Sequence, residues 1–227
     1  MTGYRFGGSE VGGVSILVAD DHAVVRRGLR ALLETQPTWK VVGEASNGRD
    51  AIEKAEKLRP DVAIIDIAMP ELNGLDAATH ILKATPHTRI LILTMHADEE
   101  LIHKTVLTGA SGYLLKSDAE RDLITAVEAL LHKKTFFTTA ASDVILDHVR
   151  WTDQNRTMQP QAGRLSLRER EVVQLLSEGK SNKEVAARLN ISTRTVETHR
   201  AKVMDRLNLH SFSELIRYAI RNKIVEL

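Results

Sequence analysis

The stretch Asp61-Val62-Ala63-Ile64-Ile65-Asp66 decides the fold of the first part of this chain. Four apolar residues, three of them β-branched, stand between polar residues, which is typical of a strand buried in a parallel sheet. Pro70 and Gly74 follow within eight residues, so the strand is expected to end near Asp66. Asp66 then lies at the carboxyl end of a strand, the edge where open α/β sheets bind their ligands.

Polar side chains close three further apolar runs. Asp20 and Asp21 follow the first run, Thr94 follows the second and Lys116 follows the third. Strand and helix patterns alternate five times between residues 15 and 131. This alternation predicts right-handed βαβ units and a doubly wound, five-stranded parallel sheet of the flavodoxin-like α/β class. Because the carboxyl ends of parallel strands meet at one edge, we expect these side chains to gather around Asp66.

The periodicity places each element of this part. The strands are expected at Ser15–Ala19, Trp39–Ala45, Val62–Ile65, Arg89–Thr94 and Ser111–Leu115. The helices are expected at His22–Thr35, Arg49–Leu58, Leu75–Ala84, Glu99–Thr108 and Ala119–His132. The sequence Ser117-Asp118-Ala119-Glu120 has the capping-box pattern and is expected to start the last of these helices.

The expected cluster has a definite chemistry. Three converging carboxylates repel one another, and a bound cation relieves that repulsion. Because carboxylate oxygens are hard ligands, Mg²⁺ or Mn²⁺ fits, with positions left for a phosphoryl oxygen. Asp66 is then placed as a carboxylate nucleophile, while Lys116 can neutralise one phosphoryl oxygen and the Thr94 hydroxyl can hydrogen-bond another. These residues predict phosphoryl transfer to Asp66.

At this spacing, Asp20-Asp21, Asp66, Thr94 and Lys116 resemble the receiver domain of bacterial two-component response regulators, and the resemblance covers residues 15–131. It implies that a sensor histidine kinase phosphorylates Asp66. It also implies that Asp21 ligates Mg²⁺ directly, that Asp20 assists, and that the main-chain carbonyl of Ala68 is a further ligand.

The same resemblance implies a switch in which the Thr94 hydroxyl moves to the phosphoryl group and the Tyr113 ring turns inward behind it. From the residues alone, Tyr113 could equally be a core aromatic, and Thr94 could cap the following helix. One position departs from the commonest receiver pattern. Ser117 follows Lys116 where proline is usual, so a cis peptide bond is not expected there.

The composition is that of an ordinary globular protein, with 43% hydrophobic and 27% charged residues and no apolar run long enough to span a membrane. Residues 1–13 contain five glycines and no apolar segment, which predicts a disordered tail instead of a secretory signal. The chain has no cysteine, which excludes disulfides, thiol catalysis and thiolate zinc sites. We therefore expect a cytoplasmic protein with no membrane partner.

Charge is distributed unevenly along the chain. Residues 164–227 carry 13 Lys and Arg against 8 Asp and Glu, a net charge of +5, whereas residues 1–163 carry 18 against 22, a net charge of −4. This asymmetry favours a polyanionic partner for the second part alone. The expected organisation is a tail at 1–13, the phosphoacceptor domain at 14–132, a polar linker with one short helix at 133–163, and a second domain at 164–227.

The patterns after residue 164 are entirely helical. Ser-x-x-Glu capping boxes begin at Ser166, Ser181 and Ser211, and Ser192 is another N-cap candidate. The expected helices are Leu167–Glu178, Lys183–Leu189, Thr193–Leu207 and Ser213–Asn222. A tight turn at residues 190–192 joins a short helix to a longer basic one, which predicts a helix-turn-helix. Its expected apolar seam consists of Ala186, Leu189, Ile191 and Val196.

Three motifs, Leu165–Glu171, Gly179–Glu184 and Thr195–His199, resemble the LuxR-type DNA-binding domain, and the match runs to about Val225. Joined to a receiver, this domain is similar to the NarL/FixJ class of response regulators. The resemblance implies that residues 193–206 enter the major groove and that the last helix provides a dimer contact on DNA. The DNA contacts it implies are Lys183, Arg194, Thr195, Glu197, Thr198, His199, Arg200, Ala201 and Lys202.

The resulting hypothesis is a transcription regulator controlled by phosphorylation at Asp66, with no enzymatic activity beyond its own phosphorylation and dephosphorylation. It would dimerise when phosphorylated and bind double-stranded DNA, with a sensor histidine kinase and RNA polymerase as further partners.

Two alternatives belong to other classes. A phosphotransfer enzyme acting on a metabolite would need a pocket for which the sequence offers no candidate, and it would leave the second domain unexplained. A DNA-binding protein with a degenerate receiver would lack an acid or the lysine, whereas all five residues are present. DNA binding unaffected by Asp66→Ala and by a phosphodonor would favour that second alternative.

Overall fold

The computed structural model describes residues 13–95, 99–137 and 165–225. Residues 1–12 of the expected tail, the short linker helix and most of the linker lie outside the described residues. Within them, no helix has the length and apolar content needed to cross a membrane.

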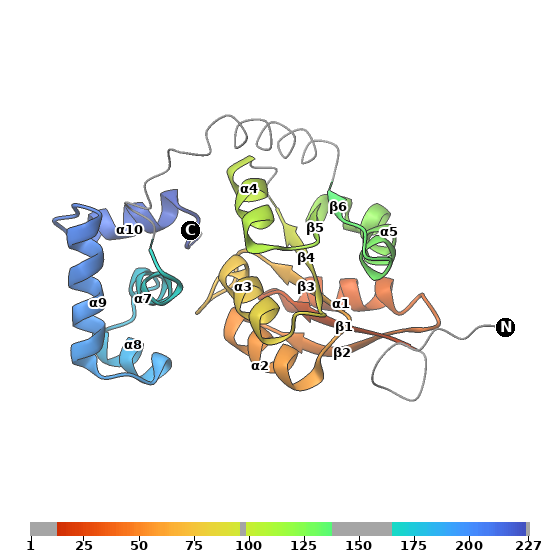
Figure 1. The fold of residues 1–227 in the computed structure, drawn as a ribbon, viewed down its shortest axis with the longest axis horizontal. Coiled ribbons are helices and arrows are strands. Elements are labelled where there is room, and N and C mark those ends of the chain that lie inside the picture. Colours follow the sequence, from red (N-terminus) through yellow and green to blue (C-terminus); the bar gives the residue numbers. More distant parts are fainter. Residues whose placement is uncertain (1–12, 96–98, 138–164, 226–227) are drawn as a thin grey trace.

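The first part of the chain forms a parallel sheet with the strand order β2-β1-β3-β4-β5-β6 (Figure 1). The strands are β1 (Val14–Ala19), β2 (Trp39–Ala45), β3 (Val62–Asp66), β4 (Arg89–Thr94), β5 (Gly112–Leu115) and β6 (Phe136–Phe137). The first five agree with the predicted strands to within one residue. The sheet has six strands instead of the predicted five, because β6 adds a two-residue edge strand that is too short to show any periodicity.

Two apolar layers hold five helices against this sheet. The helices are α1 (Ala23–Leu33), α2 (Gly48–Leu58), α3 (Gly74–Ala84), α4 (Glu99–Thr108) and α5 (Ala119–Leu131). One core packs α1 and α5 on the sheet through residues such as Leu33 and Leu123. The other core packs α2, α3 and α4 on the opposite face through residues such as Ala51 and Ile81. The sheet is therefore covered on both faces, and its carboxyl edge carries the polar residues.

The predicted capping box at Ser117 is wrong. The chain makes a 3₁₀ turn, η1 (Lys116–Asp118), before α5, and the N-cap of α5 is Asp118, which makes no side-chain capping bond. An N-cap residue needs an extended backbone, and Ser117 lies inside the 3₁₀ turn instead. The sequence placed the helix correctly but not the way in which it starts.

The second part of the chain is entirely helical where it is described. Its helices are α7 (Leu167–Ser177), α8 (Asn182–Leu189), α9 (Thr193–Arg206) and α10 (Phe212–Arg221). Complete capping boxes start α7 at Ser166 and α8 at Ser181, as predicted, and Ser192 caps α9. Ser211 caps α10, but Glu214 accepts the N–H of His210 instead of closing the box.

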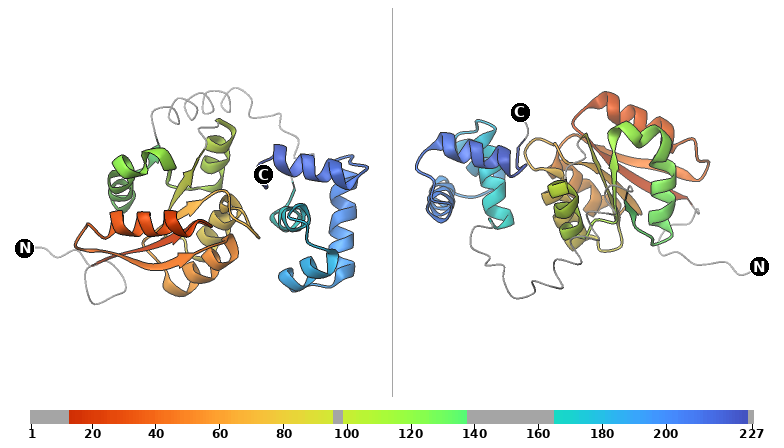
Figure 2. Two further views of the ribbon diagram at one scale, coloured as in Figure 1. Left: turned by 180° about the vertical axis from the view of Figure 1, so that it is seen from behind. Right: turned by 90° about the horizontal axis from the view of Figure 1, so that it is seen from above.

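The helix-turn-helix prediction corresponds to α8 and α9. Ala186, Leu189 and Val196 of its predicted seam are buried, and Ile191 is partly buried against them. Figures 1 and 2 show α7 between the parallel sheet and α9, so that α9 lies on the side of the second domain away from the sheet.

Candidate functional site

The carboxyl edge of the sheet brings four of the predicted side chains together. Ala19 is paired with Ile65 and Asp66 with Leu93, so the ends of β1, β3 and β4 lie side by side. Asp20, Asp66 and Thr94 are at most 2% exposed. Lys116, which follows β5, reaches the same place and completes the cluster.

Lys116 links the two buried carboxylates. Its Nζ lies 2.8 Å from Oδ2 of Asp20 and 2.8 Å from Oδ2 of Asp66. Burial alone would lower the pKa of Lys116, but the hydrogen bonds to Asp20 and Asp66 outweigh it and raise this pKa. Burial raises the pKa of Asp66 to about 6, although the hydrogen bond and charge of Lys116 act in the opposite direction. The ion pair therefore offsets only part of the cost of burying the Asp66 carboxylate.

A second group of possible metal ligands, two carboxylates and an imidazole, lies beside this ion pair. Asp20, Asp21 and His22 offer ligand atoms that all lie within 4.8 Å of one another. Asp21 is exposed, and Asp21 and Ala68 both line an open cleft. Carboxylate and carbonyl oxygens are the ligands that Mg²⁺ prefers. The acidic cluster is therefore consistent with the Mg²⁺ site that the sequence predicted.

Two residues that the sequence analysis did not single out support the acidic pair. The ring nitrogen Nδ1 of His22 lies 2.6 Å from Asp21 Oδ1, and the main-chain N–H of His22 donates to Asp20 Oδ1 at 2.8 Å. The Arg26 guanidinium donates to the main-chain carbonyls of Asp20 and Asp21. The position of His22 directly after two acids is the sequence signal that could have identified it.

The two proposed switch residues are both in the core. Tyr113 is 1% exposed and belongs to the apolar layer that contains Ile92 and Leu101. Tyr113 is therefore buried in the layer between the sheet and helices α2, α3 and α4, and Thr94 is buried at the end of β4. Burial of this kind fits both readings of Tyr113, the core aromatic and the inward-turned switch. No cis peptide bond occurs among the described residues, in keeping with Ser117 after Lys116.

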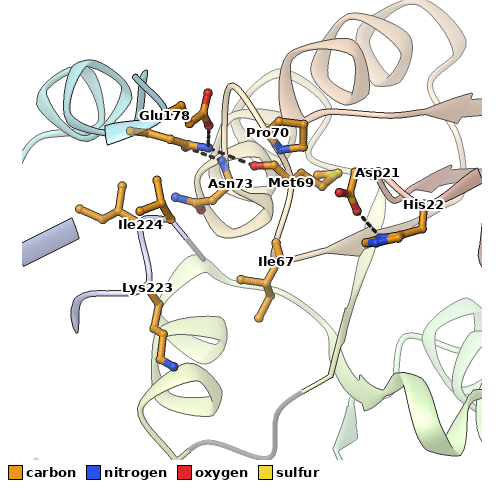
Figure 3. A pocket seen from close by; sticks show the side chains of 12 residues that line it. Asp21, His22, Ile67, Met69, Pro70, Asn73, Glu178, Lys223 and Ile224 are labelled. Carbon is orange, nitrogen blue, oxygen red and sulfur yellow. Dashed lines mark hydrogen bonds and ion pairs between the residues drawn. The ribbon is translucent and has the colours of Figure 1, made fainter. Parts of the chain in front are cut away.

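An open cleft of about 340 Å³ leads to the acidic group. Asp21, His22 and residues 67–70 and 73 of the first domain form one side of this cleft (Figure 3). Gln174, Glu178 and residues 223–225 of the second domain form its other side. The sequence analysis did not predict this second side, because no local pattern reveals which surface of one domain meets another.

The helix predicted to bind DNA has one buried and one exposed side. Val196 and Val203 of α9 are buried in the core of the second domain. Arg194, Glu197, Thr198, Ala201 and Lys202 are exposed, as is Lys183 of α8, while Thr195, His199 and Arg200 are partly exposed. The Thr195 hydroxyl is engaged with Ser192 in the helix cap, at 2.8 Å. The Arg200 guanidinium lies 5.4 Å from the centre of the Phe212 ring, so a cation–π contact with α10 helps to position it.

Comparison with known protein families divides the chain in the same way. Residues 16–128 match the response regulator receiver domain, and residues 164–219 match the bacterial regulatory proteins of the luxR family.

Two curated relatives align with nearly the whole chain. The oxygen regulatory protein NreC of Staphylococcus carnosus is 38% identical over 218 residues, which cover 94% of this chain and all of that protein. The NreC protein of Staphylococcus aureus is 36% identical over the same coverage.

Solved structures show the same two-part architecture. The RcsB response regulator of Salmonella typhimurium aligns with a TM-score of 0.60 at 28% identity, covering 92% of this chain and 97% of that one. A structure of the RcsB response regulator in complex with DNA aligns with a TM-score of 0.55 at 29% identity, covering 91% and 97%.

Proposed function

We propose a function on the premise that this chain belongs to the two-component response regulators that join a receiver domain to a LuxR-type DNA-binding domain. Such a protein is a phosphorylation-dependent transcription regulator and not an enzyme of the ordinary kind. Our proposal is that Asp66 accepts the phosphoryl group from a sensor histidine kinase and that α9 reads the operator. The observation that carries it is the Asp20–Lys116–Asp66 cluster, which is buried at the carboxyl edge of the sheet next to Asp21, a residue that lines the open cleft.

Each side chain of the cluster has its own role in the proposed phosphorylation step. Asp66 is the nucleophile, and its ionised carboxylate oxygen would bond to phosphorus as the bond from phosphorus to the kinase histidine breaks and the imidazole leaves. A protonated carboxyl has lost the charge that makes it reactive. Lys116 and the Thr94 hydroxyl are placed to hold phosphoryl oxygens, once Lys116 exchanges its present carboxylate partners for them. Mg²⁺, held by Asp20, Asp21, Asp66 and the Ala68 carbonyl, would screen the negative charges that meet in the cleft.

The output step belongs to the second domain. We propose that phosphorylation favours a dimer in which two copies of α9 occupy half-sites about one DNA turn apart. The protein would then act in the cytoplasm on double-stranded DNA, and RNA polymerase would be its further partner. The exposed basic residues of α9 would hold phosphates, and Glu197, Thr198 and Ala201 would face the bases.

The proposal is tested by selecting binding sites from a random-sequence duplex DNA library with the full chain. Selection is run with acetyl phosphate and Mg²⁺, without them, and with Asp66→Ala. We expect paired half-sites and a higher affinity only for the phosphorylated wild type. Equal affinities for all three samples would contradict the proposal and favour the degenerate-receiver alternative.

Lys202 and Glu197 are expected to contribute to DNA binding in different ways. Lys202→Ala removes a phosphate contact, so the slope of log affinity against log salt concentration should fall by about 0.9 for any duplex. Glu197→Ala removes a base-facing acceptor, so it should change the ranking of sequences and leave the salt slope unreduced. Fluorescence anisotropy with the selected site and a scrambled duplex measures both quantities. A reduced slope for Glu197→Ala with unchanged ranking would contradict the assigned roles.

A further inference from the structure

The turn between β1 and α1 carries two acids side by side. Asp20 and Asp21 follow β1 directly, and α1 begins at Ala23. Two ionised carboxylates on neighbouring residues repel each other, which works against holding both in the arrangement that a cation needs. His22, the N-cap residue of α1, makes no side-chain capping bond, so the turn is not fixed in the way usual at the start of a helix.

Arg26, one turn into α1, fixes the backbone of this turn. Its Nη1 donates to the main-chain carbonyl of Asp20 at 2.8 Å and to that of Asp21 at 3.2 Å. The Arg26 side chain is only 16% exposed, so these bonds are largely shielded from water. Because one guanidinium nitrogen binds two successive carbonyls, the backbone has little freedom left to move the two carboxylates apart.

Glu44 of β2 in turn holds Arg26. Arg26 Nε lies 3.3 Å from Glu44 Oε2, and Arg30 Nε lies 3.1 Å from Glu44 Oε1. Arg30 also donates to the Val41 carbonyl at 3.2 Å, and Lys54 of α2 donates to the Glu44 carbonyl. Basic side chains from two helices therefore fix both the carboxylate and the carbonyl of Glu44.

The sheet places Glu44 beside the turn. Val18 is paired with Glu44 and Ala19 with Ala45 across the β1–β2 ladder. The Asp20 N–H then donates to the Ala45 carbonyl at 3.1 Å, which is the last main-chain bond of this pairing. The bonds from Glu44 through Arg26 to the carbonyls of the turn extend the rigid sheet beyond the end of its strands.

The charge of Arg26 does not explain its place beside an acidic pair that binds a cation. A guanidinium repels a nearby cation, so its charge alone would weaken Mg²⁺ binding. Its hydrogen bonds act in the opposite direction, because Mg²⁺ requires near-ideal octahedral geometry and binds best to ligands that are already in place. Groups that orient metal ligands without touching the metal change affinity or activity by roughly 10–100-fold.

We propose that Arg26 is a positioning residue for the divalent cation. It fixes the main-chain carbonyls of Asp20 and Asp21, Glu44 fixes Arg26, and the two carboxylates are thereby held ready for the ion. The inference rests on the proposed function, in which that cation serves phosphoryl transfer to Asp66. Arg26 acts through the acidic pair and is not itself a ligand.

Mn²⁺ binding to the full chain tests this role, because Mn²⁺ takes the same hard oxygen ligands as Mg²⁺ and its free ion is measured by electron paramagnetic resonance. Arg26→Ala should weaken Mn²⁺ binding about 10-fold or more. If charge alone mattered, the same substitution would tighten binding. Asp21→Ala should abolish the signal of bound Mn²⁺, which assigns that signal to the acidic pair.

Arg27→Ala is the matched control. Arg27 is the next residue of α1, is exposed, and donates to the Ala23 carbonyl of its own helix. Its removal takes away the same charge without touching the turn, so Mn²⁺ affinity should not fall.

Two further variants separate positioning from charge and from misfolding. Arg26→Lys keeps the charge but replaces the planar fork with a point donor, so it should also weaken Mn²⁺ binding. Adding Glu44→Gln to Arg26→Ala should cause little further loss, because Glu44 acts through Arg26. Glu44 keeps Arg30 as a partner in Arg26→Ala, so this variant should still unfold cooperatively in urea with EDTA.

The rate of phosphorylation by acetyl phosphate gives a second measurement that a general structural defect would not reproduce. In Arg26→Ala the Mg²⁺ concentration for half-maximal rate should rise by the same factor as the Mn²⁺ dissociation constant, and the maximal rate should be retained. A variant with a damaged fold would instead have a lower maximal rate at every Mg²⁺ concentration.

The outcomes distinguish failure of this inference from failure of the proposed function. Equal or tighter Mn²⁺ binding by Arg26→Ala would overturn the positioning role and leave phosphorylation of Asp66 standing. Weaker Mn²⁺ binding by Arg26→Ala with no gain of phosphate in the wild type would confirm the positioning of the cation and overturn the proposed function. Absence of Asp21-dependent Mn²⁺ binding in the wild type would overturn the inference.

Discussion

Asp66→Asn is expected to stabilise the magnesium-free receiver by about 3 kcal/mol at pH 8. Folding raises the pKa of Asp66 from 3.8 to about 6. A shift of that size corresponds to about 3 kcal/mol of unfavourable free energy for the ionised carboxylate. Asparagine keeps the shape of the side chain and removes its charge, while Lys116 keeps its partner Asp20.

The pH dependence has a definite sign. Below pH 3.8 Asp66 is protonated in both states, so it makes no difference to stability. Between pH 3.8 and about 6 the unfolded chain binds fewer protons than the folded chain, so wild-type stability falls as the pH rises. Above pH 6 the difference between Asp66→Asn and wild type should be constant.

Urea unfolding in EDTA, followed by Trp39 fluorescence in a Trp151→Phe background, measures this difference. Added Mg²⁺ should stabilise the wild type much more than the variant, because a ligand that binds only the folded state adds to its stability. Equal stability of Asp66→Asn and wild type from pH 5 to pH 8 would contradict the conclusion that burying the ionised Asp66 carboxylate costs folding free energy.

Gly74→Ala is expected to destabilise the receiver by about 3 kcal/mol or more. The new methyl group would lie 1.9 Å from the Asp66 carbonyl oxygen, a main-chain atom that cannot move aside without displacing β3. The substitution should therefore disturb three features together: the phosphoacceptor, the start of α3, and the loop of residues 67–73, which Gln174 contacts through the Asn73 N–H and the Met69 carbonyl. Urea unfolding measures the loss of stability, and intact mass after incubation with acetyl phosphate and Mg²⁺ measures the loss of phosphorylation.

Gly28→Ala is the matched control. Gly28 lies within α1, and apart from the neighbouring helix backbone no atom lies within 4 Å of an added Cβ, so alanine should stabilise the helix by roughly 0.5–1 kcal/mol. Opposite signs for the two glycines would confirm that close packing at Asp66, and not the loss of glycine as such, is responsible. Similar small effects at both positions would contradict the packing described here.

Much of this architecture could be predicted from the sequence, because the responsible patterns are local. The apolar run before Asp66 is a buried strand, and the serines at 166 and 181 start helices through complete capping boxes. The convergence of Asp20, Asp66, Thr94 and Lys116 followed from parallel strand ends sharing an edge. Each prediction needed only neighbouring residues and one rule of topology.

What could not be predicted depends on contacts between distant parts of the chain. Gln174 and Glu171 have the composition of a solvated helix face, and nothing near them in the sequence indicates that a receiver loop covers them. The strand at Phe136–Phe137 exists only because β5 offers an unpaired edge. The pairing of Lys116 with two carboxylates at once is likewise a property of the assembled sheet.

Intact mass spectrometry with peptide mapping tests most directly whether Asp66 is the phosphoacceptor. Wild type and Asp66→Ala are each incubated with acetyl phosphate, with and without Mg²⁺. We predict the gain of one phosphoryl group, located at Asp66, in the wild type with Mg²⁺ only. A gain that persists in Asp66→Ala, or none in the wild type with acetyl phosphate and with a panel of histidine kinases, would contradict the account.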